Sequence, residues 1–265
     1  MSAFQTRKRF GQHFLHESFI IEKIISAIHP KKMDHMLEIG PGMGALTQEL
    51  LPLLDRLIVV ELDKDLIPLL EKQCAPLGEL IIYQADALKF DLRSAGGPNI
   101  RWRIVGNLPY NISTPLLFHL LEQVDAIQDM HFMLQKEVVE RMVAQPGSAH
   151  YGRLSVMIQY YCQVKKLFIV KPGAFNPPPK VDSAVIRLIP YQTPPWQADD
   201  PALFAEIVRT AFSHRRKMLR NNLGQLISVK QFELLEIDPK QRPEQLSVMD
   251  YVKLSNFLSQ QQPKS

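Results

Sequence analysis

The chain has 265 residues, 46% of them hydrophobic and 22% charged, which is enough to bury one large core or a large core and a smaller partner. No run approaches the roughly eighteen apolar residues of a membrane span, and the basic N-terminus lacks the apolar stretch of a secretory signal. Cys74 and Cys162 stand far apart without a partner motif, which excludes a disulfide framework and a zinc site. We therefore expect a cytoplasmic protein.

The net charge is only +4, but the basic residues are unevenly distributed. Residues 7–9 are all basic and no acidic residue precedes Glu17, and residues 209–224 carry five Lys or Arg and no acid. One such run is usually a solvated surface. Two acid-free runs favour a polyanionic partner.

Apolar runs alternate with segments of helical period through the first two thirds of the chain, which predicts an α/β fold with a doubly wound, mostly parallel sheet. We expect seven strands, at residues 36–39, 57–62, 80–84, 103–106, 131–134, 166–170 and 183–189. The last two are joined by KPGAFNPPPKVD, which is too short for a crossover helix. These two strands should pair antiparallel at the sheet edge.

Residues 190–201 are rich in proline and lose periodicity, which indicates a domain boundary. Beyond them, residues 203–258 have helical spacing and predict a small domain of about four helices. We therefore divide the chain into residues 1–193 and residues 194–265. Within the second domain, Ser213 is expected to cap one helix that carries the basic residues Arg215, Arg216, Lys217 and Arg220.

Gly40, Gly42 and Gly44 follow the first predicted strand, where glycine permits a tight turn and close approach of a ligand to the backbone. Their spacing departs from the GxGxxG of dinucleotide enzymes, so it does not demand a pyrophosphate. Glu61 and Asp86 end the next two strands, where carboxylates can accept hydrogen bonds from ribose hydroxyls and an adenine amine. Either acid alone is more often a helix cap or a surface charge. Together with the glycine loop they predict an adenosine site.

The fourth predicted strand ends in Asn107-Leu108-Pro109-Tyr110. A simple turn with a core tyrosine is one interpretation. The other applies if the adenosine belongs to S-adenosylmethionine. The Asn107 side-chain oxygen and the Leu108 carbonyl would then accept the hydrogens of an exocyclic amine and concentrate its lone pair, while Tyr110 stacks on the base. A sulfonium is already an activated methyl donor, so neither a general base nor a metal is required.

Seven motifs, in order, resemble the bacterial ribosomal small-subunit RNA adenine dimethyltransferases, the kasugamycin-sensitivity enzymes: GQHFL, LEIGPGMGALT, ELD, ADAL, GNLPYNIST, FNPPPKVDSAV and AFSHRRKMLRN. The resemblance spans nearly the whole chain. It implies a Rossmann-like class I methyltransferase domain that uses S-adenosyl-L-methionine and a small helical RNA-binding domain. It also implies N6,N6-dimethylation of two adjacent adenosines near the 3′ end of 16S rRNA during small-subunit maturation. The partner is expected to be 16S rRNA within the small subunit or its precursor, and we expect a monomeric protein without a metal.

The resemblance also assigns residues. Cofactor contacts are expected at His13, Leu15, Gly40, Gly42, Glu61, Asp86 and Asn107, where His13 replaces an asparagine of many relatives. Catalytic roles are expected for Asn107, Leu108, Pro109, Tyr110 and Phe175. Phe175 either covers the second face of the base or anchors its loop. From the basic runs, RNA phosphates are expected to contact Arg7, Lys8, Arg9, Arg215, Arg216, Lys217 and Arg220.

Three alternatives differ in substrate or in chemistry. A 23S rRNA adenine-N6 methyltransferase of the antibiotic-resistance type is the nearest, but FNPPPKVDSAV and SHRRKMLRN favour the small-subunit group. DNA adenine and protein glutamine methyltransferases more often carry Asp or Asn followed by Pro-Pro-Tyr. A non-catalytic nucleic-acid-binding factor on the same fold would not need the intact motif at residues 107–110 together with Glu61 and Asp86.

Overall fold

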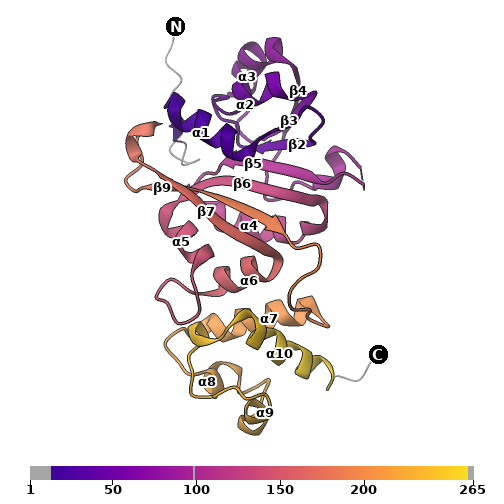
Figure 1. The fold of residues 1–265 in the computed structure, drawn as a ribbon, viewed down its shortest axis with the longest axis vertical. Coiled ribbons are helices and arrows are strands. Elements are labelled where there is room, and N and C mark those ends of the chain that lie inside the picture. The colour runs from indigo at the N-terminus through magenta and orange to yellow at the C-terminus, as the bar shows by residue number, and fades with distance from the viewer. Residues whose placement is uncertain (1–12, 98, 262–265) are drawn as a thin grey trace. The chain divides into compact units, whose positions relative to one another are not determined.

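The computed structural model describes residues 13–97 and 99–261 of the chain (Figure 1). The chain divides into two compact units, Met1–Val139 with Lys165–Pro190, and Glu140–Val164 with Tyr191–Ser265. We call them unit 1 and unit 2. Unit 2 includes residues 140–164, which the sequence analysis placed in the first domain, so the division at residue 193 remains a prediction.

Unit 1 is built on a seven-stranded sheet of order β4-β3-β2-β5-β6-β9-β7 (Figure 1). Its strands are β2 (Met36–Ile39), β3 (Arg56–Glu61), β4 (Glu79–Gln84), β5 (Trp102–Asn107), β6 (Ile127–Gln135), β7 (Cys162–Val170) and β9 (Ser183–Pro190). All seven predicted strands are confirmed. The pairings of β2 with β3 and β5, of β3 with β4, and of β5 with β6 are parallel, whereas β9 runs antiparallel to β6. The last two strands are neighbours, as expected, but β7 forms the edge and β9 lies inside the sheet.

The central strands read as continuous apolar runs because both of their faces are covered. All four residues of β2 are buried, as are five of the six residues of β3. The α-helices of the first two thirds of the chain are α1 (Ser18–Ile28), α2 (Thr47–Leu50), α3 (Ile67–Cys74), α4 (Ser113–Leu121), α5 (Lys136–Val143) and α6 (Arg153–Tyr161). The core of unit 1 combines residues of α1, such as Ile24 and Ile28, with residues of the central strands.

Gly106 explains how closely two central strands approach each other. A Cβ atom at this position would lie 2.6 Å from the backbone oxygen of Ile39, the last residue of β2. That distance is too short for any side chain, so glycine is needed at the end of β5. The close approach brings Asn107 next to the loop that follows β2.

A second, two-stranded sheet joins distant parts of the chain. In it, β1 (Phe14–Leu15) pairs antiparallel with β8 (Phe175–Asn176), and His16 N donates to Ala174 O at 3.0 Å. Strands of two residues have no detectable period, so the sequence analysis missed both. They place residues 13–15 beside the sheet of unit 1.

The described residues after 200 form four α-helices, in agreement with the predicted number of about four: α7 (Pro201–Ala211), α8 (Leu219–Leu223), α9 (Val229–Leu234) and α10 (Val248–Ser259). None of the helices formed by the described residues is long and apolar enough to cross a membrane.

The single helix predicted to follow Ser213 is wrong. Phe212–His214 form a 3-10 turn, and α8 begins only at Leu219 after an extended Met218. The Ser213 hydroxyl donates backwards to Thr210 O at 2.7 Å and caps nothing. Arg216 and Arg220 therefore do not lie one turn apart on one helix.

Arg215 has a structural contact within unit 2. Its guanidinium donates to the carbonyl oxygens of Ala149 and Tyr151, the latter at 2.8 Å. This bond joins the segment before α6 to the segment after α7. Arg215 thus helps to hold unit 2 together, whatever else it contacts.

Candidate active site

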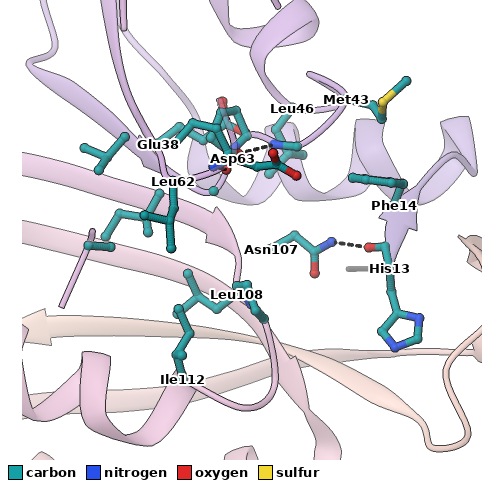
Figure 2. Close-up of a pocket in the computed structure, with 18 of the residues that line it drawn as sticks. His13, Phe14, Glu38, Met43, Leu46, Leu62, Asp63, Asn107, Leu108 and Ile112 are labelled. Atoms are coloured by element: carbon teal, nitrogen blue, oxygen red, sulfur yellow. Dashed lines mark hydrogen bonds between the residues drawn. The ribbon is translucent and has the colours of Figure 1, made fainter. Parts of the chain in front are cut away.

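A cavity opens in unit 1 at the carboxyl ends of β2, β3, β4 and β5 (Figure 2). It contains about 1080 Å³ of empty space, including the part that is open to solvent. Ten of the predicted site residues line it: His13, Leu15, Gly40, Gly42, Glu61, Asp86, Asn107, Leu108, Pro109 and Tyr110. The fold brings these residues together, as expected from the meeting of parallel strand ends at one sheet edge.

The loop after β2 forms one wall of the cavity. Gly40 and Gly42 have φ values of 66° and 59°, in the left-handed region that favours glycine. A Cβ atom on Gly42 would lie 3.1 Å from the Phe14 ring, so this glycine also lets the loop pack against β1. Gly44 does not line the cavity, and a Cβ there would meet the Cys74 sulfur at 2.9 Å. The third glycine of the motif therefore serves packing.

Glu61 and Asp86 are held by backbone amides. The two oxygens of Glu61 accept from Asp63 N at 2.8 Å and from Gly42 N at 3.3 Å, and Asp86 Oδ1 accepts from Leu88 N at 3.0 Å. Burial raises the pKa of Glu61, and the two amide bonds oppose this shift. A carboxylate has about four acceptor sites, so both groups can still accept hydrogen bonds from a ligand.

Glu38 is a pocket residue that the sequence analysis missed. Its side chain is 1% exposed, lines the cavity and accepts a hydrogen bond from Thr47 Oγ1 at 2.7 Å. Burial, with a smaller contribution from the charge of Glu61, raises the pKa of Glu38 to about 7. The available signal was an acidic residue inside the otherwise apolar run Met36–Ile39.

Glu38→Gln should make unfolding less sensitive to pH. The folded pKa of about 7 exceeds the ordinary 4.5, so the folded state binds more protons in this window and loses stability as the pH rises through it. Glutamine keeps an acceptor for Thr47. We expect the free energy of unfolding of the variant to exceed that of wild type by about 3 kcal/mol at pH 8 and by less than about 1 kcal/mol at pH 5. Urea unfolding at both pH values measures it, and a difference independent of pH would contradict the assignment.

Asn107, the last residue of β5, has a fixed side-chain orientation. Its Nδ2 donates to the His13 carbonyl oxygen at 2.9 Å, which leaves Oδ1 turned away from His13 (Figure 2). Leu108 N donates to Met133 O at 3.1 Å and fixes the next peptide against β6. The amide therefore presents an oriented acceptor to the cavity, as the amine-binding interpretation requires.

Tyr110 lines the cavity and is only partly buried, so it is not a core tyrosine of a simple turn. Its hydroxyl lies 2.6 Å from Ser183 Oγ, and its ring is stacked beside the His13 ring with centroids 5.5 Å apart. Burial raises the pKa of Tyr110, so the phenol stays neutral at physiological pH. His13 Nδ1 lies 2.7 Å from Pro177 O, which makes this nitrogen the protonated one. His13 thus contacts both Asn107 and Tyr110.

Phe175 differs from the prediction of a base-covering ring. It is 2% exposed, belongs to the hydrophobic core with Leu15, and does not line the cavity. Its position in β8 turns the ring inward, which corresponds to the alternative of a loop anchor.

The predicted RNA contacts fall into three groups. Arg7, Lys8 and Arg9 lie outside the described residues. Arg216, Lys217 and Arg220 are exposed on unit 2, whereas Arg215 holds two carbonyl oxygens there. Their contact with RNA stays a prediction.

The cavity has further lining residues that sequence reasoning did not single out. Labelled examples are Phe14, Met43, Leu46, Leu62, Asp63 and Ile112 (Figure 2). Most follow directly on motif residues, so their places could be inferred once the strand ends were known. Across residues 13–97 and 99–261, no group of three or more His, Cys, Asp or Glu is arranged to hold a metal ion.

The sequence matches known proteins along most of its length. The family model described as ribosomal RNA adenine dimethylase matches residues 3–260. The ribosomal RNA small subunit methyltransferase A of Pseudomonas aeruginosa is 56% identical over 256 residues, which cover 97% of this chain and 96% of that protein. The protein of the same name from Marinomonas sp. is 52% identical and covers 96% of each chain.

Two solved structures are similar over both units. A dimethyladenosine transferase from Plasmodium falciparum has a TM-score of 0.78 and 31% identity, with 91% of this chain and 96% of that chain covered. The 23S rRNA methyltransferase ErmE has a TM-score of 0.72 and 22% identity, with 93% and 99% covered, and at that identity shows a shared fold alone.

Proposed function

Because the chain belongs to the ribosomal RNA adenine dimethylase family, we propose that it transfers methyl groups from S-adenosylmethionine to the N6 amines of two adjacent adenosines near the 3′ end of 16S rRNA. The observation that carries this proposal is the oriented Asn107 oxygen in the cavity that also contains Glu61 and Asp86. The substrate is the small ribosomal subunit or its precursor.

The residues of the cavity fit the cofactor. Glu61 would accept hydrogen bonds from the ribose hydroxyls and Asp86 from the adenine amine, through acceptor sites that their amide partners leave available. Gly42 has no side chain to obstruct a ligand next to Phe14. When bound, S-adenosylmethionine supplies a methyl group that is already activated by the sulfonium.

The remaining chemistry is positioning of the amine. Asn107 Oδ1 and the Leu108 carbonyl would accept its two hydrogens, which moves the nitrogen towards tetrahedral geometry and concentrates its lone pair. Tyr110 would stack on the base. After the first transfer only one N–H remains, so the site must also hold a rotated amine that carries a methyl group.

Glu61→Ala should weaken cofactor affinity by about ten- to a hundredfold for each charge-assisted hydrogen bond that it removes, because one such bond is worth roughly 1.5 to 3 kcal/mol. Calorimetric titration with S-adenosylmethionine measures the change, with a melting curve to show that the variant is folded. Glu71→Ala is a matched control, since Glu71 is exposed on α3. Equal affinities of wild type and Glu61→Ala would remove Glu61 from the site.

The proposed substrate is tested directly by incubating the protein with labelled S-adenosylmethionine and unmethylated small or large subunits, and then mapping the modified nucleotides. Label at two adjacent adenosines of 16S rRNA is expected. Label only in large-subunit RNA would favour the 23S alternative, and no label in either RNA would favour a non-catalytic binding factor.

The exposed basic residues of unit 2 are proposed to contact rRNA phosphates, which position the RNA while the cavity selects the base. Replacing Arg216, Lys217 and Arg220 together by Gln should flatten the slope of log affinity against log salt by roughly 0.7 to 0.9 for each phosphate that is no longer bound, up to about 2.7 if all three residues hold a phosphate. Arg215 is left in place because it bonds to Tyr151 O. Cofactor affinity should not change.

A salt series of RNA-binding titrations measures this slope. The matched control replaces Lys31, Lys32 and Lys72, which are exposed on unit 1, by Gln. The control removes the same charge from another surface. Parallel slopes for wild type and the unit 2 variant would mean that these residues form only a solvated surface.

A further inference from the structure

Tyr110 is fixed by hydrogen bonds at both ends, at its backbone carbonyl and at its hydroxyl. Its backbone carbonyl accepts a hydrogen bond from Ser113 Oγ at 3.1 Å, and its hydroxyl lies 2.6 Å from Ser183 Oγ. The His13 ring lies beside the Tyr110 ring with an interplanar angle of 30°. The ring therefore cannot tilt without losing its bond to Ser183 or its contact with His13.

Ser183 is the rigid partner of this pair. It is 0% exposed and is the first residue of β9, where it pairs with Gln135 of β6. Lys136 N donates to Asp182 O at 2.9 Å and continues the pairing beyond the strand ends. The Ser183 hydroxyl is thus fixed on the inner part of the sheet.

Ser183 does not line the cavity, whereas Tyr110 does. Because Ser183 is fully buried, its hydroxyl reaches the cavity through the side chain to which it is hydrogen-bonded. Ser183 contacts the hydroxyl of Tyr110, which lies at the end of the ring that is farthest from the backbone.

We propose that Ser183 is a positioning residue for methyl transfer, which sets the tilt of the Tyr110 ring and thereby the plane of the target adenine. The inference rests on the proposed function and deepens it. A base stacked on a tilted ring moves its N6 amine away from the Asn107 and Leu108 acceptors, and small misplacements of a reacting atom slow a reaction strongly. The second transfer depends most on the ring, because the monomethylated amine has only one N–H left for those acceptors.

The test uses Ser183→Ala, Tyr110→Phe and the double variant in single-turnover reactions with labelled S-adenosylmethionine and unmethylated small subunits. Monomethyl and dimethyl products are quantified separately. Each single variant should slow the second transfer by about three- to tenfold and accumulate monomethyladenosine, and the double variant should be no slower than either. Cofactor affinity, measured by calorimetry, should stay unchanged.

Ser155→Ala is the matched control. Ser155 is also a fully buried serine, and its hydroxyl bonds to backbone groups of unit 2, so its removal reports the general effect of deleting a buried hydroxyl. It should leave the ratio of monomethyl to dimethyl product at the wild-type value.

Three outcomes overturn the inference alone: wild-type rates in Ser183→Ala, losses that add up in the double variant, or equal slowing of both transfers as in a merely destabilised protein. Wild-type protein that labels no small-subunit adenosine would instead overturn the proposed function, and the inference with it.

Discussion

Asn107→Ala should lower the single-turnover rate of methyl transfer by about a hundred- to a thousandfold while RNA affinity changes little. The amide acts on charge that develops on the amine during the reaction, and an oriented dipole of this kind has effects of about that size in other enzymes. The protein itself fixes this orientation, because Nδ2 donates to the His13 carbonyl oxygen at 2.9 Å. Rapid-quench kinetics and a binding titration with the same RNA separate the two quantities.

Asn107→Asp separates the role of the side-chain acceptor oxygen from the role of the hydrogen bond that orients it. Aspartate keeps an acceptor but places a carboxylate oxygen against the His13 carbonyl, so the side chain should lose its fixed orientation and most of the rate. Asn99→Ala, in an exposed turn, is the control for an asparagine outside the cavity. A rate for Asn107→Ala within about a factor of two of wild type would rule out the proposed role.

Arg103→Met should destabilise the protein by about 3 to 5 kcal/mol, because it leaves carboxylates without their partner in a largely buried site. Arg103 is 7% exposed, and its guanidinium donates to Asp34 at 2.5 Å, to Asp129 at 3.0 Å and to Ile28 O at 2.6 Å. The last bond holds the C-terminal end of α1. Denaturant unfolding at neutral pH measures the loss.

The same variant has an expected pH dependence. Burial would raise the pKa of Asp129, but the neighbouring His131 and the charge of Arg103 outweigh it and hold that pKa below its ordinary value. A lowered folded pKa contributes stability above the unfolded pKa, and this contribution is lost as the pH falls through the folded pKa. The difference in the free energy of unfolding between wild type and Arg103→Met should therefore become smaller at acidic pH.

Arg93→Met is the matched control for this arginine. Arg93 also donates to a carboxylate, that of Asp125, at 2.7 and 2.6 Å, but both side chains are exposed, to 41% and 69%. An exposed pair contributes at most about 1 kcal/mol. Equal losses in the free energy of unfolding for the two variants would show that burial does not strengthen the ion pairs of Arg103.

The sheet could be predicted because its strands are buried on both faces and so appear as apolar runs. The site could be predicted for the same reason, since Glu61, Asp86 and Asn107 each stand at the end of such a run. The strands β1 and β8 are too short to appear as apolar runs, and their two residues each depend on a partner far away in the chain. His13 and Leu15 were therefore expected at the site only from the resemblance, and Phe14 between them was missed.

In unit 2 the error was the opposite, because one helix was predicted from the local spacing of residues where the structure has a break. The run after Ser213 has helical spacing, but Leu219 N donates to Gln241 O and Arg220 N to Pro239 O, and these tertiary bonds accompany a break before α8. Similarly, Gly147 N donates to Glu244 O within unit 2. Such contacts between distant segments leave no trace in the spacing of apolar residues.

The pairing of β1 with β8 has a consequence for the order in which the molecule is assembled during translation. His13 and Pro177 are 164 positions apart, yet their contact lies beside the pairing that places Phe14 and Leu15 in the cavity wall. Strands β2 to β5 leave the ribosome long before residue 177 and can form the floor of the cavity early. The wall has no partner until β8 has been made. A nascent chain thus gains its complete ligand pocket only after residues 175–177 have been synthesised.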